Sequence, residues 1–173
     1  MAVLLGFGIL TLAFADFIVL EQLCKPLAAK HQIPWQDLEC SVTFFGCERR
    51  IFWWHVAFIP LGFALFALMG ASARDWRIGL SGMVLFSTGW EDMTYYLIQG
   101  SWLPTDLPWL DVVPTVTWTR VLLREPHVSR IGLVIAAVSG AVIARLVLGF
   151  GGRLPFKPIA SQGGFSTDEN QKQ

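Results

Sequence analysis

The chain has 173 residues, of which 54% are hydrophobic and only 15% are charged, and its mean hydropathy is +0.53. A soluble domain carries about 25% charged residues. Lys and Arg number 13, the same as Asp and Glu, so there is no basic excess to bind nucleic-acid phosphates. The composition excludes a soluble globular enzyme, a disordered chain and a nucleic-acid-binding protein, and it predicts a multi-pass membrane protein.

Four segments approach the roughly 20 apolar residues that a helix needs to cross the hydrocarbon core. They are residues 2–20, 51–70, 78–98 and 131–150. Lipid offers no hydrogen-bond partners to the backbone, so each segment is expected to be a helix. The predicted fold is an all-α integral membrane domain over residues 1–150 with four transmembrane helices, followed by a flexible polar tail over residues 151–173. The first segment lacks the basic start of a signal peptide, and we expect it to be retained.

Two long connections are predicted on the membrane side opposite the termini, over residues 21–50 and 99–130. The second connection is rich in Trp and Pro, and Trp rings favour the headgroup level, so we expect it to lie along the membrane surface. Asp111 followed by Pro114 predicts the start of a short interfacial helix that runs to Arg124. In the fourth apolar segment, Ala136, Gly140 and Ala144 recur at the small-residue spacing that lets membrane helices approach closely.

The three cysteines all fall in or beside the first long connection, at Cys24, Cys40 and Cys47. In an oxidising compartment two of them are expected to form a disulfide, for which Cys40 with Cys47 is the candidate among three pairings. A zinc site that includes His31 is the alternative, although six residues between two cysteines is not the usual zinc spacing. Basic residues are nearly balanced between the two sides, so the cysteines alone place the termini in the cytoplasm.

Ionisable residues within the predicted spans are the main functional candidates, because burying a charge in a membrane is costly. At a rise of about 1.5 Å per residue, Asp16 in the first span and Glu91 and Asp92 in the third should lie at a similar depth. His55, near the start of the second span, should lie in the same third of the membrane. Tyr95 follows Glu91 by one helical turn and should share its face.

Three chemistries would use this cluster. Asp16, His55, Glu91 and Asp92 are of the types that bind a divalent metal, which would then be a cofactor. Alternatively, two adjacent carboxyl groups in a low dielectric cannot both ionise easily, which would make Glu91 and Asp92 a general acid and base supported by Asp16 and Tyr95. The cluster would also suit proton relay or cation transport. A structural reading stands beside these, in which the carboxyl groups hydrogen-bond to Tyr, Thr or Trp side chains and fix the helix register.

The stretch Gly89-Trp90-Glu91-Asp92-Met93-Thr94-Tyr95-Tyr96 resembles the acidic-pair-then-aromatic-pair motif of the heterodimeric-type membrane lycopene cyclases. The resemblance covers about eight residues of 173, and Gly89 and Trp90 stand where that family has a proline before the acids. It implies that an acidic pair in a membrane helix can protonate an isoprenoid, and it assigns no family to the chain.

The chain contains no phosphate-binding loop, nucleophile elbow, dinucleotide fingerprint, HExxH or CxxCH motif. Two functional hypotheses follow. The first is a small membrane enzyme that performs acid-base or metal-dependent chemistry on a lipid-soluble substrate such as an isoprenoid, quinone or acyl chain. The second is a non-catalytic accessory subunit of a larger membrane complex. The expected partners are membrane lipids, with other membrane subunits or further copies of the chain.

Overall fold

The computed structural model describes residues 1–44 and 47–149, and this part of the chain is mostly helical. Three of its helices are long and apolar enough to cross a membrane: Ala2–His31, Trp53–Ser72 and Arg130–Gly149. They correspond to the first, second and fourth predicted spans. The predicted tail over residues 151–173 lies outside the described residues.

The first helix is longer than predicted. It consists of α1 (Ala2–Phe17), a π-helical stretch η1 (Ile18–Cys24) and α2 (Lys25–His31), and it ends at Gln32, whose φ is +53°. Its 30 residues correspond to about 45 Å, well beyond the hydrocarbon thickness. Residues 21–31 were expected to be a loop because their hydropathy falls. The helix nevertheless continues, because Lys25, Ala28 and Ala29 are compatible with helix and only the apolar character is lost.

A short hairpin fills the rest of the first connection, which the sequence did not predict. A 3₁₀ turn η2 (Trp35–Leu38) leads into antiparallel strands β1 (Glu39–Phe44) and β2 (Cys47–Phe52). The register places Cys40 opposite Ile51 and Phe44 opposite Cys47. The chain then enters the long helix α3 (Trp53–Ser72) directly from β2.

The third predicted span, residues 78–98, is not one continuous helix. It comprises α4 (Trp76–Ser87) and α5 (Trp90–Gln99), separated at Thr88 and Gly89. Gly89 has φ +86°, a conformation that no β-branched or bulky residue adopts readily, and the Thr88 hydroxyl donates to the carbonyl of Val84 at 2.8 Å. A hydropathy average over the whole segment does not reveal such a break. The second half is nevertheless less apolar than the first, because α5 carries Glu91, Asp92 and Gln99.

The Trp- and Pro-rich connection folds into η3 (Pro108–Val112) and α6 (Pro114–Leu123) before α7 (Arg130–Gly149) begins. The short helix predicted to run to Arg124 is therefore present, and its interfacial location stays a prediction. Asp111, however, does not cap it: the N-cap is Val113, without a side-chain hydrogen bond. Asp111 instead accepts a hydrogen bond from the backbone N–H of Val128.

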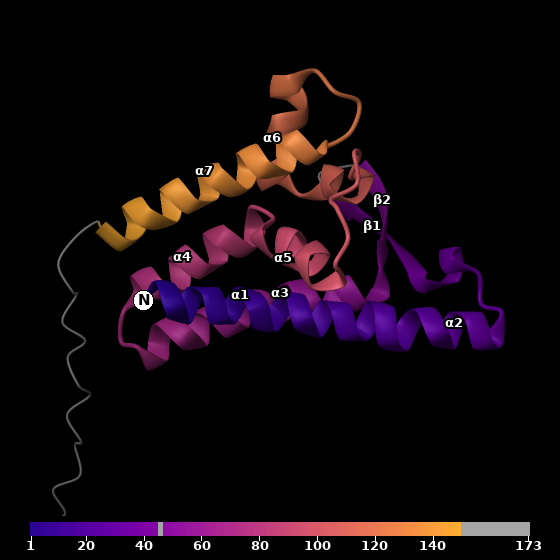
Figure 1. The fold of residues 1–173 in the computed structure, drawn as a ribbon, viewed down its shortest axis with the longest axis horizontal. Coiled ribbons are helices and arrows are strands. Elements are labelled where there is room, and N and C mark those ends of the chain that lie inside the picture. Colours follow the sequence, from indigo (N-terminus) through magenta and orange to yellow (C-terminus); the bar gives the residue numbers. More distant parts are fainter. Residues whose placement is uncertain (45–46, 150–173) are drawn as a thin grey trace, which may run out of the picture.

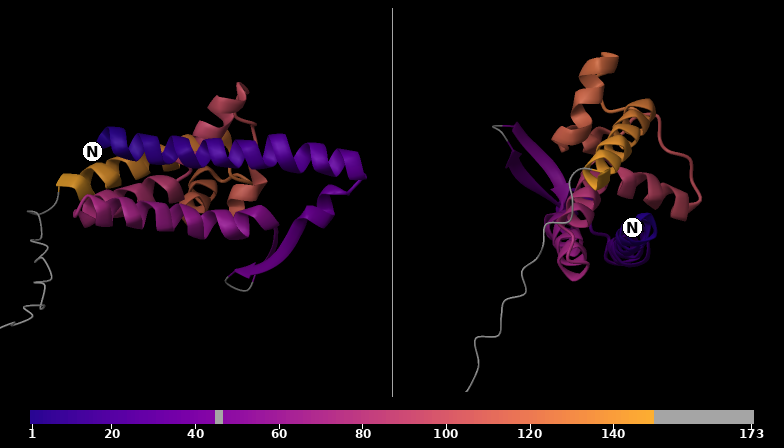
Figure 2. Two further views of the ribbon diagram at one scale, coloured as in Figure 1. Left: turned by 90° about the horizontal axis from the view of Figure 1, so that it is seen from below. Right: turned by 90° about the vertical axis from the view of Figure 1, so that its left-hand side faces the viewer.

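The long helices run alongside one another, with α2 and the hairpin extending from one end of the bundle (Figure 1). Viewed end-on, α1, the α3 and α4 pair, and α7 lie at the corners of a triangle (Figure 2). α4 packs against α3 and α7, and α5 packs against α1. The predicted small-residue stripe on α7 is buried, with Ala136 at 0% and Ala144 at 3% exposure. A Cβ added at Gly140 would lie 2.0 Å from the Thr88 hydroxyl oxygen, which shows how closely α7 approaches the break.

Large apolar side chains line the outer faces of the long helices. On α1, Val3 is 86% exposed and Phe7 is 66% exposed, and on α3 the exposed fraction of Leu68 is 65%. A water-soluble protein rarely exposes contiguous apolar surface of this kind. The arrangement is that expected of helices whose outer faces contact lipid.

Candidate functional site

Asp16 lies near the end of α1 and is only 5% exposed. Its Oδ1 accepts a hydrogen bond of 2.7 Å from the indole Nε1 of Trp54, in the first turn of α3. The same oxygen lies 3.6 Å from Nε2 of His55. Two elements far apart in the sequence thus meet at one carboxylate, as the depth estimate predicted for Asp16 and His55.

Glu91 and Asp92, in the first turn of α5, lie on the other side of this carboxylate. Asp16 interacts electrostatically with both side chains, and His55 interacts with Asp92. The Trp109 indole from η3 also contacts the Asp92 carboxylate. The structure therefore brings together all four residues singled out from the sequence, and it adds the two indole donors.

Glu91 differs from its neighbours in its hydrogen bonding. It is 7% exposed, and its Oε1 is fully buried without a hydrogen-bond partner among the described residues. Buried polar atoms are nearly always paired in folded proteins, and leaving one unpaired costs about 1–3 kcal/mol. An unpartnered acid inside an otherwise bonded cluster is the arrangement expected of a group kept available for a ligand or a reaction.

Tyr95 does not support Glu91, although the two share a helical face. Its hydroxyl donates to Oε1 of Glu21 at 2.7 Å, and Gln99 donates to the same oxygen at 3.1 Å. Lys25 completes this group as an ion pair to Glu21. Glu21 reaches Tyr95 because the first helix continues through η1, where the sequence predicted a loop. Tyr95 is therefore a link between the first helix and α5.

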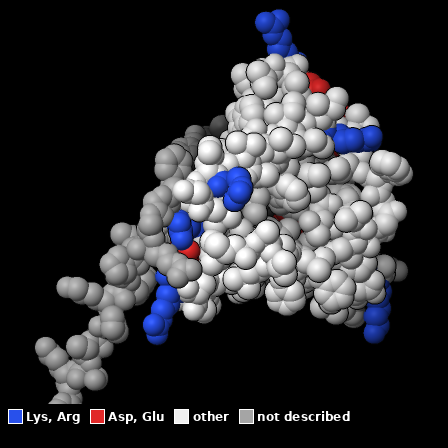
Figure 3. All heavy atoms as spheres, turned by 60° about the vertical axis from the view of Figure 1, so that its left-hand side comes forward, with Lys and Arg blue, Asp and Glu red and all other residues white. Residues whose placement is uncertain are grey.

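An open groove lies along α5, on a face of the helix to which Glu91 and Asp92 do not contribute. Its volume is about 290 Å³, and its lining is mostly apolar. Tyr96 lies in this lining and also packs on the Trp109 ring at 6.4 Å between centroids, so it stands between the groove and Asp92. Figure 3 shows a hollow with an acidic side chain in its depth on one face of the molecule, whereas none of the residues that line this groove is acidic. The residues that line the groove are Trp90, Met93, Thr94, Tyr96, Leu97, Ser101, Trp102 and Leu103.

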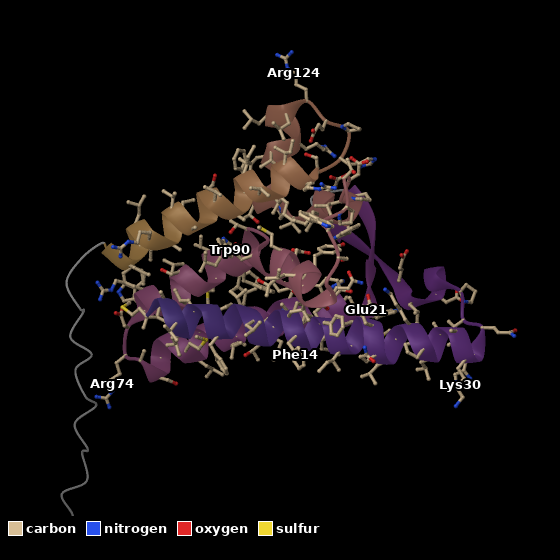
Figure 4. All side chains as sticks on the ribbon, viewed as in Figure 1. Phe14, Glu21, Lys30, Arg74, Trp90 and Arg124 are labelled. Carbon is tan, nitrogen blue, oxygen red and sulfur yellow. The ribbon has the colours of Figure 1, made fainter. Side chains whose placement is uncertain are left out.

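The positions of the labelled side chains agree with this description. Trp90 lies at the junction of α4 and α5, beneath α7, and Glu21 lies where the first helix passes α5 (Figure 4). The Trp90 indole donates to the carbonyl of Ala137 at 2.8 Å, which fixes the start of α5 against α7. The acidic pair that follows Trp90 is thereby held in a defined orientation by two neighbouring helices.

The metal alternative finds no support in the geometry. Within residues 1–44 and 47–149, no three His, Cys, Asp or Glu side chains are arranged to hold one metal ion. Metal binding by Asp16, His55, Glu91 and Asp92 stays a prediction. So does the Cys40–Cys47 disulfide, because those side chains lie outside the described residues. Cys24 is a free thiol.

A second polar cluster, which the sequence did not reveal, lies in the connection before α7. Asp111 is 8% exposed and contacts Nδ1 of His127 at 2.8 Å and Nη1 of Arg120 at 3.5 Å. Asp111 lies in η3, Arg120 in α6 and His127 in the stretch before α7, so no spacing within one helix or strand predicts their contact.

Comparisons with known proteins identified no related protein. No family model, curated protein or solved structure matches the chain. The arrangement of the site itself is therefore the basis for assigning a function.

Proposed function

We propose that the chain is an integral membrane protein in which Glu91 and Asp92 exchange a proton with a lipid-soluble substrate, such as an isoprenoid, a quinone or an acyl chain. The observation that carries this proposal is the buried, unpartnered Oε1 of Glu91. Stability alone would favour an apolar side chain or a hydrogen-bonded acid at this position. Active sites are where such unfavourable arrangements are retained.

The surroundings of Glu91 suit proton transfer. Asp16, Asp92 and His55 are close enough for their charges to interact, and only His55 among them can be cationic. Several carboxyl groups that share a poorly solvated site hold at least one proton between them, because neighbouring negative charges repel. A protonated carboxyl group would act as the general acid, and a neighbouring carboxylate would act as the base.

The groove beside α5 supplies a route for an apolar substrate. Its lining is largely aromatic and aliphatic, and Trp102 at its edge is 90% exposed. A substrate dissolved in the bilayer would reach the groove laterally, with Tyr96 between it and the acidic pair. Ligand sites of this type combine an apolar wall with a few polar groups.

Lipid analysis of membranes from cells that produce the chain tests the proposal. The Glu91→Gln variant keeps the shape of the side chain and removes its acidity, and Asp37→Asn, at an exposed position of η2, is the matched control. Mass spectrometry should reveal a lipid that accumulates with Glu91→Gln but not with the wild type or with Asp37→Asn. Identical lipid profiles for the wild type and Glu91→Gln, at equal protein levels, would refute a catalytic role.

An accessory subunit is the second candidate function. It is favoured by the exposure of Leu97 at 80% and of Trp102 at 90%, which together present a large apolar surface at the groove. Aromatic residues of this kind anchor protein interfaces. Native mass spectrometry after mild extraction distinguishes the two functions. Masses of other chains that are lost with Trp102→Ala would indicate a subunit, whereas a lipid-sized adduct on the chain alone would indicate the enzyme.

A further inference from the structure

The cluster around Asp111 is built from one buried acid and two partly exposed bases. The Asp111 side chain is 2% exposed, whereas that of His127 is 51% exposed and that of Arg120 is 31% exposed. Asp111 Oδ1 accepts the backbone N–H of Val128 at 2.8 Å, which leaves Oδ2 for the two bases. The buried carboxylate therefore fixes the positions of an imidazole and a guanidinium at the surface.

Both bases keep donors that face outward. His127 contacts Asp111 through Nδ1, and its Nε2 makes no hydrogen bond with the described residues. Arg120 uses Nη1 for Asp111 and for the carbonyl of Pro126 at 3.4 Å, and its guanidinium carries further N–H groups. A protonated imidazole and a guanidinium side by side are suited to an anion with several oxygens, such as a phosphate.

The charge of this connection agrees with an anionic ligand. Between Asp111 and Arg130 it carries three arginines, at positions 120, 124 and 130, against two acids, Asp111 and Glu125. Of these two acids, Asp111 is 8% exposed, and Glu125 is half-buried with its Oε2 buried. Arg124 points away from the bundle at the outer end of α6 (Figure 4). Between residues 111 and 130 the fully exposed charges are therefore basic.

The apolar side chains of α6 show which source of phosphate fits. Trp118 is 42% exposed, Val121 is 71% exposed and Leu122 is 62% exposed. α6 projects sideways from the long axis of α7, as an interfacial helix would (Figure 1). Exposed Trp and aliphatic residues beside Arg are typical of helices that insert one face at the headgroup level. A free phosphate ion has no apolar part that could contact this surface, whereas a lipid has acyl chains.

We propose that Arg120 and His127, positioned by Asp111, bind the phosphate of an anionic membrane lipid, with α6 inserted among the acyl chains. The inference rests on the membrane location in the proposed function and is independent of the acid-base chemistry. It assigns to the connection before α7 a lipid-binding role.

Chemical footprinting of the full chain in lipid nanodiscs tests this site. Diethyl pyrocarbonate acylates accessible imidazoles, and exposed His31 in α2 is an internal control that experiences the same reagent and the same charged lipid surface. Discs of phosphatidylcholine alone are compared with discs in which half of the lipid is phosphatidylglycerol. We expect phosphatidylglycerol to slow the modification of His127 severalfold relative to His31. Equal changes at the two histidines would overturn the proposal.

Two further experiments identify the source of the phosphate and test the role of Arg120. Inorganic phosphate added to the phosphatidylcholine discs should not protect His127; equal protection would indicate a free-anion site and overturn the lipid source. In native mass spectrometry, Arg120→Gln should retain severalfold less phosphatidylglycerol than the wild type, whereas Lys30→Gln, which removes an exposed charge on α2, should not. Equal retention by Arg120→Gln would place the lipid elsewhere and overturn the assignment. The footprint uses only the wild-type chain, so it decides the question even if Arg120→Gln fails to fold.

Discussion

The indole Nε1 of Trp54 donates a hydrogen bond of 2.7 Å to the carboxylate of Asp16 across 38 positions of sequence. This bond joins the first helix to the start of α3 at the level of the acidic pair in α5. The carboxylate is buried, so water cannot readily replace the indole. The bond accordingly has a structural role whatever the cluster does chemically.

Replacing Trp54 with Phe should lower the free energy of unfolding by about 1–3 kcal/mol, because the buried Asp16 loses its donor. The matched control is Trp53→Phe, since Trp53 is the preceding residue and is 63% exposed. Thermal unfolding of the two variants in one detergent measures the difference. Equal melting temperatures would mean that the indole bond contributes nothing to stability.

Glu91 and Asp16 should respond in opposite directions to apolar replacement. Glu91→Met removes an unpartnered buried acid. It should leave the free energy of unfolding unchanged or raise it by up to about 1–3 kcal/mol, and the melting temperature should change in the same direction. Asp16→Leu removes a bonded acid, leaves the Trp54 N–H unpaired, and should destabilise by a similar amount. Each variant deletes one carboxyl group from the cluster.

The contrast between these two variants separates function from structure. Natural active sites commonly sacrifice stability, and replacing their unfavourable groups stabilises the fold. A loss of stability in Glu91→Met as large as that in Asp16→Leu would show that Glu91 has a structural partner. The main support for its proposed catalytic role would then be gone.

Hydropathy predicted the long helices because each of them contains a long apolar run. It located three helices that are long and apolar enough to cross a membrane, and the spacing of Ala136, Gly140 and Ala144 predicted the buried face of α7. It failed where the helix continues past the end of an apolar run, as in α2, and where a predicted span is interrupted, at Gly89. The break depends on one backbone conformation, which contributes almost nothing to a hydropathy average.

The acidic site was partly predictable, because its main residues lie on predicted helices. Estimating depth from the helical rise correctly brought Asp16, His55, Glu91 and Asp92 together. The partner of Tyr95 was not predictable, because Glu21 reaches it only through the extended first helix. Asp111 in η3 and His127 in the stretch before α7 belong to different parts of the chain, so sequence spacing carries no information about their contact.

The Asp111 carboxylate should hold the connection before α7 in place. Asp111→Ala leaves the buried N–H of Val128 without its acceptor and should cost about 1–3 kcal/mol of stability. Hydrogen exchange at the Val128 amide should accelerate locally. The exposed Asp106→Ala is the control, and its exchange pattern should match that of the wild type. Unchanged protection of Val128 in Asp111→Ala would contradict this role.

The contact between Gly140 on α7 and Thr88 at the break should tolerate no added carbon. A Cβ at position 140 would lie 2.0 Å from the hydroxyl oxygen of Thr88 and 2.7 Å from its Cβ, so Gly140→Ala must push the two helices apart. Overpacking of this kind costs about 1–3 kcal/mol. Gly6→Ala is the matched control, because no atom lies within 4 Å of its added Cβ, and an alanine within a helix should be neutral or stabilising there.

A double-mutant cycle shows whether the clash is the cause. Thr88→Ala removes the hydroxyl and the methyl group but keeps its own Cβ, so it should relieve only part of the clash and should recover part of the stability lost in Gly140→Ala. The distance between α7 and Thr88 matters for the site, because Thr88 adjoins Gly89 and the first turn of α5, which carries the acidic pair. If the two effects on melting temperature simply add, the helices do not meet at these residues, and the position of α5 relative to α7 is set by other contacts.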